Sequence, residues 1–154
     1  MPQTASILTK LKREYPQFTF KSGQDSLWSP SDKTIYFDKT SPDQSAFLLH
    51  ELSHALLGHM DYGYDIQLIA MERQAWDYAI KLSTSYGLSI SDNLVQSHLD
   101  SYRDWLHARS ICPSCSSNGL QTGRKTYSCL ACGHKWRVNE ARTCALRRYS
   151  KPQN

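Results

Sequence analysis

His50-Glu51-Leu52-Ser53-His54 is the stretch around which the rest of this 154-residue chain is organised. Two histidines four residues apart lie on one face of a helix, so their imidazoles can converge on a single metal ion. Glu51 lies between them, where a carboxylate can act as the general base of a zinc-dependent hydrolase. The stretch therefore predicts a zinc centre with His50 and His54 as ligands and Glu51 as the base.

The residues on either side carry the start and stop signals of a helix. Ser41 as N-cap, Pro42 at the first helical position and Gln44 three residues after the cap form a capping box. Gly58 marks the end of the helix. Between these signals one stripe recurs at spacings of three and four residues, made of Phe47, His50, His54 and Leu57. We therefore expect the two histidines to face inward among apolar side chains.

A catalytic zinc site needs a third protein ligand and one open position. A longer helix is predicted over residues 66–86, closed by Gly87. Its expected buried stripe consists of Leu68, Ile69, Glu72, Trp76, Ala79 and Ile80. A buried carboxylate needs a cation beside it, so Glu72 is the predicted third ligand. Asp65 and Asp77 are the alternative ligands. If Glu72 has no metal-binding role, we expect it to form an exposed ion pair instead.

Three further residues near this site have candidate roles. Tyr62 and Tyr64 follow the predicted metal helix and could donate a phenol hydrogen bond to a tetrahedral intermediate, although tyrosines there also serve in packing. The metzincin pattern would need Gly at position 57 and His at position 60, whereas this chain has Leu57 and Met60. His59 is therefore interpreted as a surface residue or a neighbour of a ligand.

The remaining segments up to residue 110 predict an α+β fold. Residues 4–15 have helical spacing, and Pro16 ends the helix. Short strands are predicted at 18–20, 27–28 and 34–37, which together suggest a small antiparallel sheet. A last helix is expected from about Asp92 to Ala108, with Ser91 or Asp92 as its cap.

The chain changes character at Ile111, so we predict one domain over 1–110 and a zinc ribbon with a basic tail over 111–154. Two Cys-x-x-Cys pairs are separated by residues 116–128, and each can form a turn that offers two thiolates. The predicted ligands of this structural zinc are Cys112, Cys115, Cys129 and Cys132. Strands are expected near 125–128 and 135–138, and a helix over 140–149. Cys144 is left over as a buried or free thiol.

Charge is distributed unevenly between these two parts. Residues 1–110 contain 10 Lys and Arg against 13 Asp and Glu, whereas residues 111–154 contain 8 against 1. A basic ribbon suits an anionic partner such as nucleic acid, and docking to a regulatory protein or a solvated surface is equally open. The candidate contact residues are Lys125, Lys135, Trp136, Arg137, Arg147 and Arg148.

The composition, with 40% hydrophobic and 21% charged residues, is that of a soluble globular protein. The N-terminus lacks the uninterrupted apolar core of a secretory signal, because Lys10, Lys12 and Arg13 interrupt it. No apolar run is long enough to span a bilayer. We therefore expect a cytoplasmic protein that does not insert into membranes.

Two segments together, His50-Glu-Leu-Ser-His54-Ala-Leu-Leu-Gly-His59 and Glu72-Arg-Gln-Ala75-Trp-Asp-Tyr78-Ala79, resemble the ImmA/IrrE family of zinc metallopeptidases. The resemblance covers about residues 1–108 and implies a zincin-like helical core. It implies His50, His54 and Glu72 as ligands of a catalytic zinc, Glu51 as general base, and a protein substrate such as a DNA-binding repressor.

Two departures from the family limit this resemblance. Trp76 stands where the family usually has Asn or Asp, with the neighbouring Asp77 as a candidate replacement. A zinc ribbon also stands where many members have a helix-turn-helix or another regulatory domain. The motifs and the resemblance together still predict an intracellular zinc metallopeptidase. The alternative is a non-catalytic zinc protein whose ribbon binds nucleic acid or a partner protein.

Overall fold

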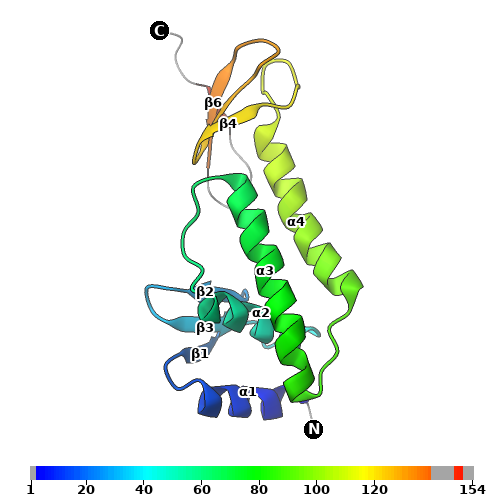
Figure 1. Cartoon of the computed structure of the whole chain (residues 1–154). Coiled ribbons are helices and arrows are strands. Elements are labelled where there is room, and N and C mark those ends of the chain that lie inside the picture. The colour runs from blue at the N-terminus through cyan, green and yellow to red at the C-terminus, as the bar shows by residue number, and fades with distance from the viewer. Residues whose placement is uncertain (1–2, 140–147, 151–154) are drawn as a thin grey trace. The chain divides into compact units, whose positions relative to one another are not determined.

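A computed structural model describes residues 3–139 and 148–150 of the chain. These residues form an α+β architecture with four α-helices and two small sheets (Figure 1). The chain divides into two compact units, and each is made of two segments. The first unit is Met1–Met60 with Met71–Val95, and the second is Asp61–Ala70 with Gln96–Asn154. The domain boundary predicted after residue 110 falls inside the second unit and stays a prediction.

The four helices predicted before residue 111 are all present, with ends shifted by a few residues. They are α1 (Gln3–Glu14), α2 (Gln44–Leu56), α3 (Asp65–Ser83) and α4 (Asp92–Ser110). A 3-10 turn, η1 (Thr84–Tyr86), extends α3 to the predicted cap Gly87, whose φ of 65° is left-handed. The Ser91 hydroxyl accepts a hydrogen bond from the Leu94 N–H at 3.1 Å, which caps α4 as predicted.

The first unit contains a mixed three-stranded sheet in the order β1-β3-β2. Its strands are β1 (Thr19–Ser22), β2 (Leu27–Ser29) and β3 (Thr34–Phe37). The central strand β3 pairs antiparallel with β2 but parallel with β1, so the predicted antiparallel sheet is wrong in this respect. Alternation of side chains is the same in both kinds of pairing, and therefore the pattern predicted the strands without their direction.

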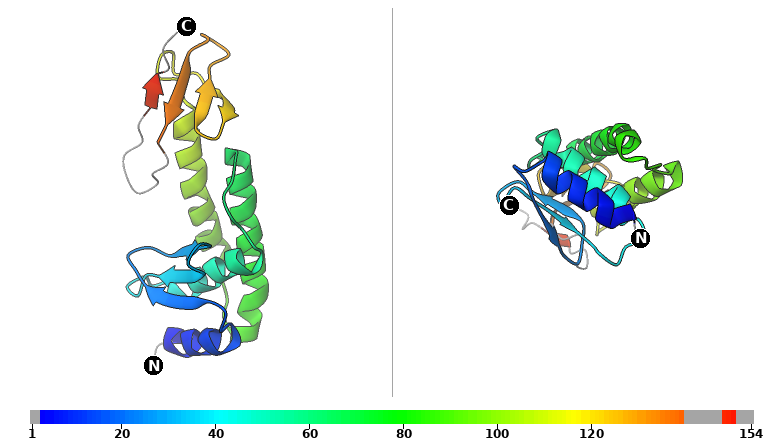
Figure 2. Two further views of the ribbon diagram at one scale, coloured as in Figure 1. Left: turned by 90° about the vertical axis from the view of Figure 1, so that its left-hand side faces the viewer. Right: turned by 90° about the horizontal axis from the view of Figure 1, so that it is seen from below.

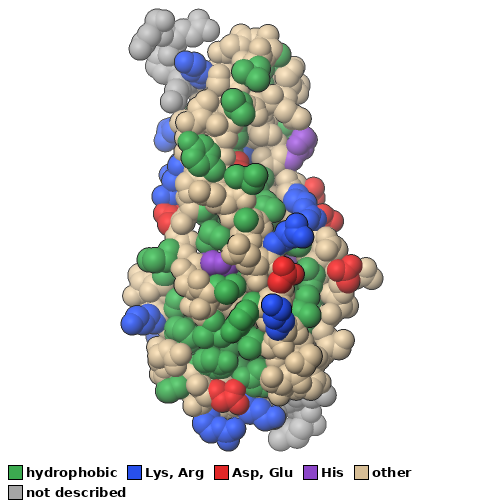
Figure 3. Space-filling model, in the orientation of Figure 1, with side chains coloured by type: hydrophobic (Ala, Val, Ile, Leu, Met, Phe, Trp, Pro, Cys, Tyr) green, Lys and Arg blue, Asp and Glu red, His purple; other side chains and the backbone are tan. Residues whose placement is uncertain are grey.

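The core of this unit lies between the sheet and the helices. Helix α2 packs on β3 and β2, and α1 packs on α2 (Figures 1 and 2). Fully buried side chains of this core include Leu11, Ile35, Leu48, Leu49, Leu52, Ala75, Trp76 and Ala79. Hydrophobic side chains also gather on the visible surface over this unit (Figure 3). Two residues predicted to face inward do not, because Leu57 and Ile80 are each 41% exposed.

The second unit contains an antiparallel four-stranded sheet in the order β4-β5-β6-β7 (Figure 2). The strands are β4 (Leu120–Gly123), β5 (Thr126–Ser128), β6 (Lys135–Val138) and β7 (Arg148–Ser150). The predicted strands near 125–128 and 135–138 are confirmed. The helix predicted over 140–149 is wrong at its end, where β7 pairs with β6. Residues 140–147, with Cys144, lie outside the described part of the chain.

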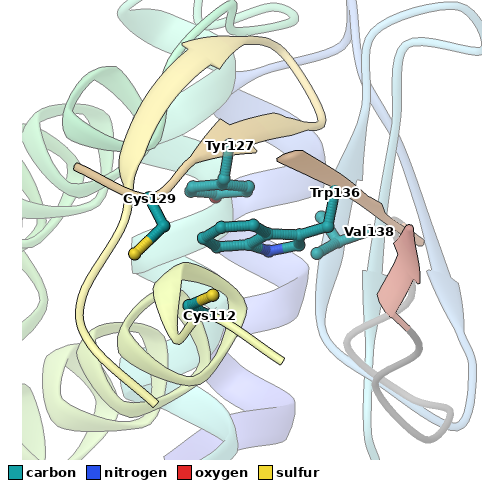
Figure 4. Packing of buried hydrophobic residues seen from close by; sticks show 5 residues of the cluster. All are labelled: Cys112, Tyr127, Cys129, Trp136 and Val138. Carbon is teal, nitrogen blue, oxygen red and sulfur yellow. The ribbon is translucent and has the colours of Figure 1, made fainter. Parts of the chain in front are cut away.

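Two stacked aromatic rings form the centre of the ribbon core. The rings of Tyr127 and Trp136 lie 5.6 Å apart at 13°, between Cys112, Cys129 and Val138 (Figure 4). The Trp136 indole N–H donates to the Arg109 carbonyl at 3.0 Å. Trp136 is fully buried, so the structure corrects its predicted place on a base-stacking surface.

The described helices include none that is both long and apolar enough to cross a bilayer.

Candidate metal centres

The His50–His54 stretch lies in the second half of α2 and faces the core, as the sequence predicts. His50, Glu51 and His54 are all buried, with His50 at 0% exposure. The helix begins at Gln44 and not at Pro42. Just before it, the Ser41 hydroxyl accepts a hydrogen bond from the Asp43 N–H at 3.2 Å. The predicted capping box is therefore corrected to a turn that leads into the helix.

Glu72 of α3 completes a cluster of three ligand atoms in the first unit. The His50 Nε2 lies 2.9 Å from the Glu72 Oε2, and the His54 Nε2 lies 3.3 Å from the Glu72 Oε1. The two histidine Nε2 atoms are 3.2 Å apart. Nitrogen and oxygen ligands about 2.0 Å from zinc lie about 3.3 Å from one another in a tetrahedral site. The spacing of these three ligand atoms therefore fits a zinc ion.

Electrostatics bind this cluster together. Burial raises the pKa of Glu72, but hydrogen bonds from His50 and His54 and their charges outweigh burial and lower this pKa far below 4.5. Burial lowers the pKa of His54, yet the hydrogen bond and charge of Glu72, with the charge of Glu51, raise it above 6.5. A carboxylate that stays ionised under burial is a good ligand for a cation.

Aromatic rings cover one side of His50. The Trp76 ring stacks on the His50 ring at 4.1 Å between centroids and 25° between planes. Phe47 meets Trp76 edge-on at 5.7 Å. Trp76 is fully buried, whereas Asp77, the candidate replacement for the polar residue of the family, is exposed. An aromatic stack thus holds the His50 ring at the position where a polar partner was expected.

His59 lies beside the cluster and is half-buried. Its Nδ1 is 2.9 Å from the His54 Nδ1, and its Nε2 is 3.0 Å from the Gln74 Oε1. Burial lowers the pKa of His59, and this effect outweighs the hydrogen bond to Gln74. Of the two interpretations of His59, the structure supports the neighbour of a ligand.

The candidate oxyanion residues belong to the second unit. Tyr62 packs against an apolar cluster of Leu68, Tyr102 and Leu106, and Tyr64 is exposed. Asp65, an alternative third ligand, accepts hydrogen bonds from Tyr127 and, at 3.3 Å, from Gln121. It also lies 3.6 Å from the Arg109 guanidinium. Asp65 therefore already has hydrogen-bond and ion-pair partners within the second unit. The roles of Tyr62 and Tyr64 stay predictions.

The Asp65–Arg109 pair is a buried feature that the sequence did not reveal. Arg109 is 1% exposed near the end of α4, and its guanidinium lies 4.4 Å from the centre of the Trp105 ring. Burial raises the pKa of Tyr127, as does its hydrogen bond to Asp65. The sequence did contain one signal for the burial of Arg109. It lies four residues after Trp105, on the face of α4 that carries the apolar side chains.

The four ribbon cysteines form the second candidate metal centre. Their sulfur atoms all lie within 4.8 Å of one another, with Cys112 and Cys132 at 3.7 Å and Cys115 and Cys129 at 3.5 Å. Thiolates about 2.3 Å from zinc lie about 3.8 Å apart in a tetrahedral site, so the cluster fits this ion. This geometry agrees with the predicted ligand set.

The thiols of this cluster differ in acidity because they share one site. Hydrogen bonds from Ser117 lower the pKa of Cys115 to about 6. A backbone hydrogen bond at His134 lowers the pKa of Cys132, but burial and the neighbouring cysteines outweigh it and raise this pKa to about 11. Cys115 and Cys132 therefore do not ionise together near neutral pH without a cation, and a bound zinc ion would favour their thiolate forms.

Basic side chains alternate with core residues along the ribbon. On β6, Lys135 and Arg137 are exposed, while Trp136 and Val138 are buried. The Arg137 guanidinium lies 4.9 Å from the centre of the Tyr149 ring on β7. Arg148 donates to the Ala108 carbonyl at 2.6 Å. Lys125 is half-buried, and Arg147 lies outside the described residues.

Comparisons of the chain with protein-family models, with curated proteins and with solved structures give no match. The two candidate metal centres therefore rest on the residues and distances given above. One is a histidine–glutamate–histidine cluster on α2 and α3, and the other is a four-cysteine cluster in the ribbon.

Proposed function

We propose that the chain is a zinc-dependent metallopeptidase that cleaves a protein substrate, with Glu51 as general base. The observation that carries the proposal is the convergence of His50, His54 and Glu72, whose ligand atoms lie 2.9 to 3.3 Å apart. The same residues carry the resemblance to ImmA/IrrE peptidases. That resemblance suggests a DNA-binding repressor as the substrate, and the ribbon zinc has a structural role.

The chemistry follows from the residue types. The two imidazoles and the Glu72 carboxylate would hold a zinc ion, which would act as a Lewis acid and lower the pKa of a bound water to about 7. Glu51 is buried on the same helix, and its charge acts on His54. It is therefore placed to take a proton from the attacking water and to return it to the leaving amine. Trp76 shields one side of His50 from solvent, which strengthens the charge interactions of the site.

The test measures metal content and proteolysis separately on the full chain. Wild-type protein should bind two zinc ions and cleave members of a proteome-derived peptide library, read by mass spectrometry. Glu51→Gln should keep both ions and lose cleavage by about 10²–10⁴-fold. Glu72→Ala should keep only the ribbon ion. Asp77→Asn, on the exposed side of α3, is the matched control and should change neither reading.

Three outcomes contradict the proposal. Cleavage by Glu51→Gln at the wild-type rate would remove the general base, and two zinc ions in Glu72→Ala would remove the third ligand. Cleavage that fails only in Asp77→Asn would assign the site to the other predicted carboxylate.

A second candidate function is binding of nucleic acid by the ribbon, and one observation favours it. Arg137 is stacked on Tyr149 beside Lys135, so a cation, an aromatic ring and a second cation are presented on neighbouring strands. Such an arrangement suits a phosphate backbone with stacked bases. In this case the histidine–glutamate centre has a structural or sensory role.

A salt titration of binding to single-stranded DNA distinguishes this candidate. The double substitution Lys135→Ala/Arg137→Ala should lower the slope of log K against log salt by about 1.4, that is, about 0.7 per contact. Lys81→Ala, an exposed lysine of α3, is the charge control and should leave the slope unchanged. Binding that does not depend on salt, or equal slopes for both variants, contradicts the candidate.

A further inference from the structure

The end of α2 folds back and brings His59 beside His54. Gly58 follows the cap residue Leu57 with a left-handed φ of 68°. The His59 N–H donates to the His54 carbonyl at 3.0 Å, and the Gly58 N–H donates to the Ala55 carbonyl at 3.2 Å. These two bonds define a Schellman motif, which places His59 next to the last turn of the helix.

Helices that end in this way usually make a hydrophobic contact between these two positions. Here the contact consists of two imidazoles, with ring centroids 5.1 Å apart and the two Nδ1 atoms at 2.9 Å. The His59 Nε2 continues to the Gln74 Oε1 on α3 at 3.0 Å. The Trp28 indole N–H donates to the His59 carbonyl at 3.3 Å and so helps to fix the backbone there. A chain of hydrogen bonds therefore runs from Gln74 through His59 to His54.

Only one arrangement of protons lets His54 bind a metal and satisfies this chain. The His54 Nε2 faces His50 and Glu72, so a neutral ligand keeps its proton on Nδ1. The His54 Nδ1–H then donates to the His59 Nδ1. His59 in turn carries its proton on Nε2 and donates to the Gln74 carbonyl oxygen. Each ring nitrogen has one role, and the amide of Gln74 ends the chain.

We propose that His59 and Gln74 are positioning residues of the metal centre, which fix the tautomer and the orientation of His54. The proposal depends on the metal centre of the proposed function, and it requires neither a particular substrate nor proteolysis. Both residues act through His54 and are not ligands. Partners of this kind typically change metal affinity by about 10–100-fold.

The test measures the zinc affinity of the histidine–glutamate centre in the full chain, by competition with a chromophoric chelator after the ribbon is loaded. His59→Leu keeps a side chain of similar size without an acceptor and should weaken zinc binding by about 10–100-fold. His59→Asn places an amide oxygen near the position of Nδ1 and should restore binding to within about 3-fold of wild type. His107→Leu, an exposed histidine of α4, is the matched control.

Gln74 is tested by a second pair of variants. Gln74→Leu removes the acceptor and should weaken binding, whereas Gln74→Glu keeps an acceptor oxygen and should bind zinc at least as tightly as wild type. Nitrogen-15 NMR of the zinc-loaded protein should place the His54 proton on Nδ1, and the Co²⁺ absorption bands should shift in His59→Leu. A purely structural role of His59 would leave both signals unchanged.

Equal zinc affinity in His59→Leu and wild type would overturn the proposal, as would His59→Asn as weak as His59→Leu. A wild-type protein that binds both ions but cleaves nothing would overturn the peptidase alone, and the affinity ratios would still decide this proposal. A wild-type protein that binds only the ribbon ion would overturn both.

Discussion

Replacing Trp76 tests whether the aromatic stack supports the metal centre. The side chain is fully buried, so Trp76→Ala removes a large ring from the core and should cost about 3–5 kcal/mol of unfolding free energy. About 0.5–1.5 kcal/mol of this loss corresponds to the ring contacts with His50 and Phe47. Trp76→Phe keeps an aromatic ring and should cost about 1–2 kcal/mol, because less volume is lost.

The same variants should separate in their zinc affinity. Trp76→Ala frees the His50 ring to rotate away from Glu72, so zinc affinity should fall about 10-fold, while Trp76→Phe should stay within about 3-fold of wild type. The assays are urea unfolding followed by circular dichroism, with and without zinc, and chelator competition.

Ile80→Ala, at an exposed position of α3, serves as the control and should change stability by no more than about 0.5 kcal/mol. A loss below about 1 kcal/mol in Trp76→Ala, together with unchanged zinc affinity, would refute the reasoning.

Three further predictions concern the charges and the packing of the two units. The raised pKa of His54 stabilises the fold below about pH 6.5, and this stability is lost as pH rises through the pKa of His54 in the folded protein. The lowered pKa of Glu72 stabilises the fold above about pH 4.5, and this stability is lost at lower pH. The His54 contribution should therefore make metal-free protein unfold at higher urea concentration at about pH 5.5 than at about pH 8, offset in part by His59, whose lowered pKa acts in the opposite direction. Saturating zinc should favour the fold at about pH 8 instead, because protons compete with the metal. Gly119→Ala would place a Cβ 2.2 Å from the Trp136 Cη2 and should destabilise the ribbon by about 1–3 kcal/mol, measured as zinc loss at lower chelator concentration; Gly63→Ala should not. Asp65→Asn should cost up to about 3–5 kcal/mol in thermal or urea unfolding, because Arg109 stays buried without its ion pair. Asp61→Asn, which breaks an exposed pair with Arg124, should cost about 0.5 kcal/mol or less, and equal losses in both variants would contradict this reasoning.

Local patterns in the sequence predicted most of the helices and the residues of both candidate metal centres. Spacings of three and four placed His50 and His54 on the inward face, and the buried stripe of α3 identified Glu72 as the carboxylate that needs a cation. The cysteine spacing predicted the second cluster. These features depend on residues close in the chain or on charge that burial makes costly, and both can be read from one sequence.

Features that depend on tertiary pairing were missed. The alternation of side chains along β1 does not depend on whether the strand runs parallel or antiparallel to β3, so it could not predict the direction. Trp136 was assigned to the surface because its neighbours Lys135 and Arg137 are basic, although alternation along β6 places it on the inner face. The role of His59 had a usable signal, because a glycine cap predicts that the next residue returns to the last helical turn. The partner Gln74 had none, since it lies on α3, 15 residues from His59 in the chain.

The division of each unit into two chain segments bears on the order of events during synthesis. His50, His54 and Glu72 all belong to a unit whose last residue is Val95, so the ribosome completes it before the first ribbon cysteine, Cys112, is made. The first turn of α3 is different, because Asp65 meets Gln121 and Tyr127 only after more than fifty further residues are added. Domains generally fold as units, in the order in which they are made. The side chains of the histidine–glutamate cluster can therefore come together on the nascent chain, whereas residues 61–70 gain these contacts only after the ribbon is made.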